Sequence, residues 1–169
     1  MAQHPPLPVV LIGPMGSGKT KVGRRVARTL GVPFVDTDKR VVAQHGPITE
    51  IFRDHGEEHF RRLEREAVRQ ALSEPAVVSL GGGAILDEDT QNDLRQHPVV
   101  LLTVTAEAVA ARITTDARPL LADGIENWQR IYDERAHIYE SLASVTFDTS
   151  TGPIMQIADR IATWAKEKA

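Results

Sequence analysis

Short runs of apolar residues alternate along the chain with longer segments whose apolar positions recur at helical spacing. We predict strands over the apolar runs, which are Val9–Ile12, Pro33–Asp36, Ala76–Leu80, Val99–Val104 and Val145–Phe147. We predict helices over the segments between and after them, which are Gly18–Leu30, Lys39–His45, Ile48–Leu72, Asp87–Gln96, Ala106–Ile113, Asn127–Leu142 and Pro153–Lys166. Apolar strands separated by helices are typical of a parallel sheet covered on both faces, so the pattern predicts an α/β fold.

Two connections between the predicted elements are unusually long. One joins Asp36 to Ala76, and the other runs from Thr114 to Ile125, is mostly polar, and joins two predicted helices. In α/β folds, insertions above the sheet commonly form lids and substrate pockets. We therefore expect the residues that select a substrate to lie in these two connections.

The first predicted strand leads into a glycine-rich segment. Residues 13–20 read GPMGSGKT, which matches GxxxxGK followed by Ser or Thr, and a predicted helix follows. Glycines let the backbone turn its N–H groups toward phosphate oxygens, and the helix N-terminus adds a positive potential. In this motif the lysine, here Lys19, reaches the β- and γ-phosphates, while the Thr20 hydroxyl can ligate Mg²⁺. The segment predicts nucleoside triphosphate binding, with a chance match as the alternative.

Length, charge and cysteine content limit what else the chain can be. It has 169 residues, a formal net charge of −3 and no cysteine. This length suits one domain, and the charge argues against a nucleic-acid partner that relies on bulk charge. The apolar runs are too short to span a bilayer and the N-terminus does not resemble a signal peptide, so we expect no membrane partner. Because the lack of cysteine fits a reducing compartment, we expect a cytoplasmic protein.

Two carboxylates lie at the end of the second predicted strand. Asp36 and Asp38 are two residues apart, so on an extended chain their side chains point the same way. At the carboxyl end of a parallel strand, one can hold a magnesium-bound water and the other can accept a proton from a substrate hydroxyl. The alternative is a turn whose aspartates cap the following helix.

A charged cluster lies in the first long connection. Arg61 and Glu64 can share a helix face, where the carboxylate orients the guanidinium for binding an anion; a solvated charged face is the alternative. The same stretch contains His55-Gly56-Glu57-Glu58-His59, which has the spelling HxxEH of inverted zinc metalloproteases. Because Gly56 weakens a helix at this point, we do not expect zinc chemistry here.

Three further groups contain candidate ligand-binding residues. The run Gly81–Gly83 follows the third predicted strand, where glycines bring backbone N–H groups close to a ligand; a flexible turn is the alternative. Arg118 lies in the second long connection, where an arginine can neutralise charge on a transferring phosphate. Arg135 and Tyr139 share a helix face, with simple helix packing as the alternative.

Together these segments resemble the shikimate kinase family. The order is GPMGSGKT, DTD, F-x3-GExxFRxxE from Phe52 to Glu64, SLGGGA, RPLL and R-x3-Y, and the match extends from about Val9 to the C-terminal helix. The resemblance implies a P-loop NTPase fold like that of nucleoside monophosphate kinases, with a five-stranded parallel sheet flanked by helices. Residues 1–169 would form one domain, with a substrate-binding insertion over about residues 37–72 and a lid over about residues 114–124.

The resemblance also implies an activity and a role for each candidate residue. The γ-phosphate of ATP would pass to the 3-hydroxyl of shikimate, on the pathway to chorismate and the aromatic amino acids. We expect a monomer that uses ATP, shikimate and one Mg²⁺ ion. Catalytic residues would be Lys19, Asp38 and Arg118; ATP would be bound by Gly16, Ser17, Gly18, Lys19, Thr20, Lys21 and Arg118; shikimate by Asp38, Arg61, Gly82 and Arg135, with Glu64 supporting Arg61; and Mg²⁺ by Thr20 and, through water, Asp36.

Two other functions stay open. Another small-molecule kinase of this fold, such as a gluconate kinase, would also use a phosphate loop, although the FRxxE and triple-glycine segments count against it. A nucleotide-binding protein without phosphoryl transfer is the second, although all residues expected to act on the phosphates and the acceptor are present. Release of ADP that depends on added shikimate separates the three functions.

Overall fold

A five-stranded parallel sheet forms the centre of the molecule. The computed structural model describes residues 6–115 and 124–168. The strands are β1 (Val9–Ile12), β2 (Phe34–Asp36), β3 (Val77–Ser79), β4 (Val99–Thr103) and β5 (Val145–Asp148), in the order β2-β3-β1-β4-β5. All neighbouring pairs are parallel. The prediction of a parallel sheet is confirmed, and each predicted strand is present with its ends shifted by at most one residue.

Helices connect the strands, as the pattern predicts. They are α1 (Lys19–Leu30), α2 (Thr37–His45), α3 (Ile48–Ala71), α4 (Glu88–Leu94), α5 (Ala106–Thr115), α6 (Gly124–Leu142) and α7 (Ile154–Glu167), with a short 3₁₀ helix, η1 (Ala84–Leu86). Two helix starts differ from the prediction by more than one residue: α2 begins at Thr37 rather than Lys39, and α6 begins at Gly124 rather than Asn127. The η1 turn was not predicted. Among the described residues, no helix combines the length and hydropathy needed to cross a membrane.

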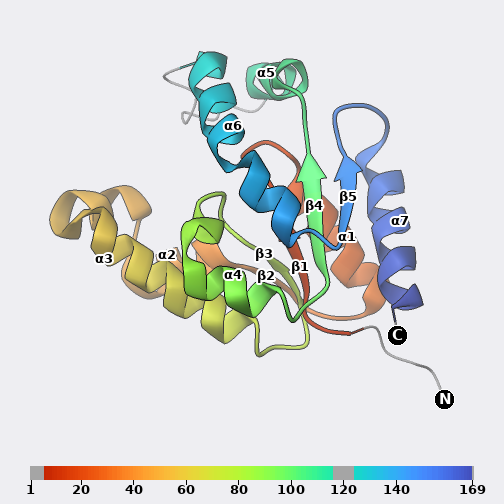
Figure 1. Ribbon diagram of the computed structural model, residues 1–169, viewed down its shortest axis with the longest axis horizontal. Helices are drawn as coiled ribbons and strands as arrows, with labels where there is room; N and C mark the ends of the chain where they lie inside the picture. Colours follow the sequence, from red (N-terminus) through yellow and green to blue (C-terminus); the bar gives the residue numbers. More distant parts are fainter. Residues whose placement is uncertain (1–5, 116–123, 169) are drawn as a thin grey trace.

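The helices form one layer on each face of the sheet (Figure 1). Side chains alternate between the faces along a strand, and β1 illustrates this. Val9 and Leu11 pack with α1 and α7, whereas Val10 and Ile12 pack with α3, α4 and α6. All four side chains are at most 1% exposed. This burial on both faces explains why the central strands are continuous apolar runs rather than alternating ones.

The carboxyl ends of the strands define one edge of the sheet, where three loops meet. The loop after β1 leads into α1, Asp36 at the end of β2 leads into α2, and Gly81–Gly83 connects β3 to η1. Ser79 near the end of β3 is in register with both Leu11 and Asp36, so the three loops are neighbours. Figure 1 shows α5 and the N-terminal part of α6 beyond the end of the sheet to which the arrows of β4 and β5 point, while the rest of α6 runs alongside β4.

Helix α3 is interrupted near its first third. Gly56 has φ 85° and ψ 171°, which is not helical, so the prediction that this glycine weakens the helix is confirmed. The rings of His55 and His59 lie 4.8 Å apart on either side of it. In the described ranges, no group of three or more His, Asp or Glu side chains is arranged to hold a metal ion.

Candidate active site

The loop after β1 has the backbone geometry of an anion-binding turn. Gly13 has φ 148°, and a Cβ at this position would collide with the carbonyl oxygen of Leu102. Gly18 has φ 93° and precedes α1, which begins without a side-chain cap. The first-turn N–H groups of an uncapped helix are well placed for the oxygens of an anion. The predicted strand, loop and helix are thus all present around the phosphate-binding motif.

Lys19 extends back along this loop. Its Nζ donates hydrogen bonds to the carbonyl oxygens of Gly13 (2.6 Å) and Pro14 (3.2 Å). Ser17 is wholly buried and its N–H donates to the carbonyl of Pro14 (3.2 Å), which closes the turn, whereas Lys21 is exposed. The Ser17 hydroxyl is buried close to Gly13 and has no hydrogen-bond partner among the described residues, whereas the Lys21 side chain points to solvent.

Asp36 and Asp38 do not lie on an extended chain, and this part of the prediction is wrong. Asp36 is the N-cap of α2 and its carboxylate accepts a hydrogen bond from the N–H of Lys39 (3.2 Å). Asp38 therefore lies in the first helical turn. A strong capping residue directly after the strand starts the helix at once, which is the alternative interpretation of this pair. The two carboxylates still affect each other, because the charge of Asp36 raises the pKa of Asp38.

The carboxylate of Asp38 lies against the backbone of Gly81. A Cβ at Gly81 would lie 2.7 Å from Oδ2 of Asp38 and nearer still to Oδ1. Burial is the main cause of a raised pKa for Asp38, and the charge of Asp36 adds to it, whereas Lys19 and Arg61 lower this pKa. Asp38 thus lies within electrostatic reach of both the phosphate-loop lysine and Arg61.

Arg61 is held by a buried carboxylate, as predicted. Its Nη1 donates a hydrogen bond to Oε1 of Glu64 (2.9 Å), and Glu64 is only 4% exposed. Burial raises the pKa of Glu64, although its hydrogen bond with Arg61 acts in the opposite direction. A Cβ at Gly83 would lie 2.6 Å from Nη1 of Arg61, so the guanidinium lies directly on the glycine loop.

Helix α6 contacts the same loop through the predicted pair. The Tyr139 hydroxyl donates to the carbonyl oxygen of Gly82 (2.7 Å), and a Cβ at Gly82 would lie 3.5 Å from Nη1 of Arg135. The three glycines thus have three different side chains against them, with Asp38 on Gly81, Arg135 on Gly82 and Arg61 on Gly83. Close approach, rather than a flexible turn, explains Gly81 and Gly83, whereas a Cβ at Gly82 would make only an ordinary van der Waals contact.

The structure brings the described candidate residues together at one edge of the sheet, although Asp36 and Asp38 do not lie on an extended chain as predicted. Three further residues contact this site. Arg118 lies outside the described residues. Sequence reasoning missed Arg112 on α5, Trp128 on α6 and Thr149 after β5, whose side chains donate hydrogen bonds to the phosphate loop. An aromatic residue on a predicted helix is far more often part of a core, so its sequence position alone does not indicate such a contact.

These features define a class of protein. A phosphate loop ends β1, and beside it a half-buried carboxylate and two guanidinium groups surround a glycine loop at the end of β3. The first part suits a nucleoside triphosphate, and the second suits an anionic acceptor with a hydroxyl group. By this geometry, the molecule is a P-loop kinase that phosphorylates a small acidic compound.

Comparison with known proteins identifies the family. The family model described as shikimate kinase matches residues 15–166. The shikimate kinase of Thermobifida fusca is 47% identical over 157 residues, covering 90% of this chain and 91% of its own. That of Streptomyces coelicolor is 46% identical over 145 residues, covering 83% and 85%. This chain belongs to the shikimate kinase family.

Solved structures agree with this assignment. A shikimate kinase from Acinetobacter baumannii, in complex with shikimate, superimposes with a TM-score of 0.85 at 33% identity, covering 92% of this chain and 90% of its own. A gluconokinase from Sinorhizobium meliloti gives a TM-score of 0.68 at 20% identity, covering 98% and 94%. The second likeness shows the fold alone, so a shared fold does not favour gluconate as the acceptor.

Proposed function

We propose that this protein transfers the γ-phosphate of ATP to the 3-hydroxyl of shikimate, producing shikimate 3-phosphate and ADP on the pathway to chorismate and the aromatic amino acids. The observation that carries the proposal is the position of Asp38, whose carboxylate lies on Gly81 within electrostatic reach of Lys19 and Arg61. A group in this position can hold a hydroxyl between a triphosphate and the residues that bind an acceptor's anionic end. Residues 1–169 form one kinase domain in this proposal, and a cytoplasmic location stays a prediction.

The acceptor carboxylate binds to Arg61 and Arg135. Arg61 belongs to α3 and Arg135 to α6, and the guanidinium groups of both lie against the Gly81–Gly83 loop. Planar guanidinium groups match a planar carboxylate by paired hydrogen bonds, which an ammonium group cannot reproduce. Glu64 fixes the orientation of Arg61, and the backbone of Gly82 contacts the acceptor between the two arginines. This arrangement selects an acidic acceptor rather than a neutral sugar.

Asp38 acts on the reacting hydroxyl. Its raised pKa gives a better proton acceptor than an ordinary aspartate, which is favourable for general-base assistance. Lys19 supplies positive charge at the transferring phosphate, where phosphoryl transfer depends chiefly on positioning and electrostatic stabilisation. Arg118 and a lid over about residues 114–124 complete the proposed set of catalytic groups. Both are predicted from the sequence alone.

The residues present fit one Mg²⁺ ion bound together with ATP. Thr20 lies in the first turn of α1 and Asp36 at the end of β2, both at the same edge of the sheet. Mg²⁺ prefers oxygen ligands and keeps several waters and phosphate oxygens, so it needs only one or two protein groups. Thr20 would bind the ion directly and Asp36 through water, and the ion would neutralise charge on the β- and γ-phosphates.

Steady-state ADP release tests the proposal. ATP and magnesium are supplied with shikimate, with gluconate or with no acceptor, and release should rise many-fold only with shikimate. Lys19→Ala should lower that rate by about 10²-fold or more while circular dichroism stays unchanged, since removing one electrostatic contact to a transition state has this effect. Gluconate dependence would identify the alternative kinase, and acceptor-independent release would exclude a kinase of this type.

A further inference from the structure

Three consecutive carbonyl oxygens of the phosphate loop accept hydrogen bonds from side chains that lie outside the loop. The donors come from α5, from α6 and from the segment after β5, which are far apart in the sequence. The bonds run from Arg112 Nη1 to Gly16 O (2.6 Å), from Trp128 Nε1 to Met15 O (2.8 Å) and from Thr149 Oγ1 to Ser17 O (2.7 Å). The outer side of the loop is thus held by parts of the chain that the sequence motif does not include.

A carbonyl held on the outer side determines where the next N–H points. In a planar trans peptide the C=O and the following N–H point in opposite directions. The carbonyl of Met15 shares its peptide with the N–H of Gly16, and that of Ser17 shares its peptide with the N–H of Gly18. Drawing these carbonyls outward turns the two glycine N–H groups inward, toward the position of the phosphates.

The loop cannot fix these two peptides by itself. Gly16 and Gly18 have φ values of 82° and 93°, and glycine adopts many backbone conformations at similar energy. An external donor that is itself rigid can select one orientation. Trp128 is 5% exposed, stacks on Tyr132 with ring centroids 5.5 Å apart, and packs with Val104 and Val109. Its indole is therefore held by contacts that do not involve the loop.

Thr149 is equally well fixed. It is 1% exposed and its N–H donates to the carbonyl of Thr103 (2.8 Å), which continues the pairing of β5 with β4. Its hydroxyl lies 2.7 Å from the carbonyl oxygen of Ser17 and 3.1 Å from that of Thr103. Because the site is buried, bulk water cannot readily replace the hydroxyl if it is removed.

We propose that Trp128 and Thr149 are positioning residues for the nucleotide, which orient the Gly16 and Gly18 peptides so that their N–H groups bind phosphate. This inference rests on the proposed function only in that a nucleotide phosphate occupies the loop. Neither residue touches the acceptor side of the site. Changes at these positions should therefore alter nucleotide binding and leave shikimate binding unchanged.

Trp128→Phe tests the first donor. Phenylalanine keeps an aromatic ring on Tyr132 but has no N–H, and losing one net hydrogen bond should weaken ADP binding by about five- to tenfold. Tyr132→Phe is the matched control, since it removes a polar group from the neighbouring ring of the same stack and should leave ADP affinity within about twofold of wild type. ADP affinity is measured by calorimetry, and KM values for ATP and shikimate are measured separately. Equal loss of nucleotide and shikimate affinity in Trp128→Phe would overturn the inference.

Thr149 allows a test that separates positioning from stability. Thr149→Val keeps the side-chain shape but removes the hydroxyl, whereas Thr149→Ser keeps the hydroxyl and loses a methyl group. ADP affinity should fall about fivefold in the valine variant and stay within about twofold of wild type in the serine variant, whichever unfolds at the lower temperature. If affinity follows thermal stability instead, or if both variants bind ADP as wild type does, the inference is wrong. Direct ADP binding needs no acceptor, so absence of shikimate-dependent turnover would contradict the proposed function alone.

Discussion

Asp38 is the residue at which stability and activity conflict. Burial and the neighbouring charge of Asp36 raise its pKa, so the folded protein holds the Asp38 proton more tightly than the unfolded chain does. A raised pKa contributes stability that is fully present below the unfolded pKa and is lost as the pH rises through the folded pKa. At neutral pH, therefore, the ionised carboxylate that suits the reaction also destabilises the fold.

Asp38→Asn should reverse this compromise. Because the neutral amide removes a buried charge, we expect a higher melting temperature than wild type at pH 7 and a difference that shrinks toward pH 3, near which aspartate is protonated in both states. Turnover should fall by about 10²–10⁴-fold if Asp38 is a general base. Thermal unfolding across pH and initial rates measure both effects. Asp54→Asn is the control, because it changes an exposed aspartate and should alter neither melting temperature nor turnover. A stability difference between Asp38→Asn and wild type that does not depend on pH would contradict the prediction.

Arg61 should be sensitive to a change that preserves its charge. Its fork is oriented by Glu64, and Arg61→Lys retains the positive charge but loses the planar pair of donors. We expect a KM for shikimate raised by about tenfold or more, with ADP affinity unchanged. Arg62→Lys is the control, since Arg62 is exposed, lies next in the chain, and its Nη2 lies 3.4 Å from Nδ1 of His59 on the same helix. A loss confined to nucleotide affinity would show that the acceptor site lies elsewhere.

The glycine loop after β3 is the element that sets the spacing of the acceptor site. Gly83 has φ −96° and ψ −3°, which alanine adopts without strain, but an alanine Cβ would lie 2.6 Å from the Arg61 guanidinium. Because that group is the end of a flexible side chain, Gly83→Ala should displace Arg61 at little cost to stability. We expect shikimate affinity to fall by about tenfold, close to the effect of losing the charged hydrogen bonds of Arg61.

A double-mutant cycle distinguishes this cause from a general distortion of the loop. Once Arg61→Ala has removed the guanidinium, adding Gly83→Ala should have little further effect on shikimate affinity, because the two changes act on one contact. Additive losses would mean that Gly83→Ala acts through the loop backbone instead. Shikimate affinity and ADP affinity are measured by separate titrations of the three variants, and ADP affinity should stay constant in all of them.

At the scale of elements, local rules predict the phosphate loop better than the acceptor loop. The motif at residues 13–20 requires only neighbouring residues, so the strand, turn and helix around it follow from sequence. The pairing of Asp36 and Asp38 was misjudged because capping by Asp36 begins α2 directly after β2. The contact of Trp128 with Met15 spans most of the chain, and no local pattern encodes it.

The arrangement of the whole molecule depends on strand order, which the hydrophobic pattern does not contain. Apolar runs predict parallel strands, but the order β2-β3-β1-β4-β5 follows from which helices pack on which face. That order places β3 between β1 and β2, and so puts the glycine loop between the phosphate loop and Asp38. The family resemblance named the same residues, but their distances from the glycines come only from the fold.

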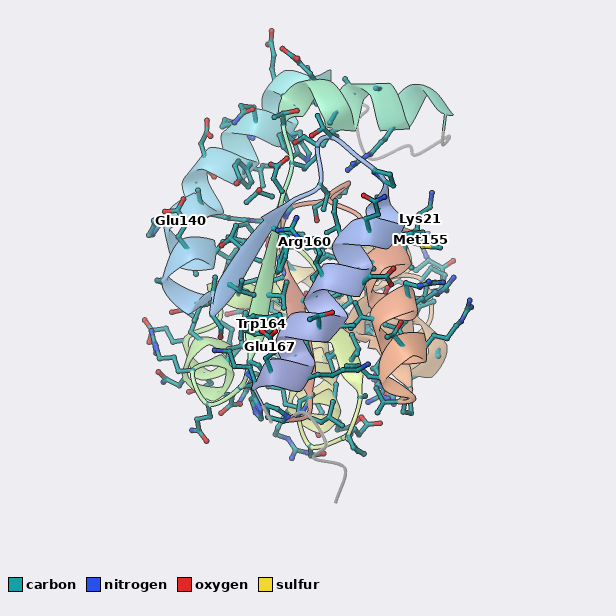
Figure 2. All side chains as sticks on the ribbon, turned by 90° about the vertical axis from the view of Figure 1, so that its right-hand side faces the viewer. Lys21, Glu140, Met155, Arg160, Trp164 and Glu167 are labelled. Atoms are coloured by element: carbon teal, nitrogen blue, oxygen red, sulfur yellow. The ribbon has the colours of Figure 1, made fainter. Side chains whose placement is uncertain are left out.

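Oligomeric state is a property of the whole molecule, and we expect a monomer. Candidate side chains on α1, α2, α3 and α6 already meet around the phosphate loop and the Gly81–Gly83 loop within this chain. Strand β5 lies at an edge of the sheet, beside α7 (Figure 2). There Arg160 covers the ring of Phe147 at 5.2 Å and Lys168 covers that of Trp164 at 5.4 Å, while Asp159 and Glu167 line the adjoining hollow.

Lysine, aspartate and glutamate side chains are scarce at the centres of stable interfaces, so Lys168, Asp159 and Glu167 make this edge poorly suited to pairing with a second copy. Sedimentation should give a single species near 18.6 kDa at micromolar concentration. Specific activity should stay constant when the protein is diluted from about 10 µM to about 10 nM, because mass action cannot affect a site that one chain completes. Arg160→Ala, which uncovers Phe147, is the informative variant at this edge, and it should leave both results unchanged. Specific activity that falls on dilution, together with a heavier species at high concentration, would show that a second chain contributes to the site.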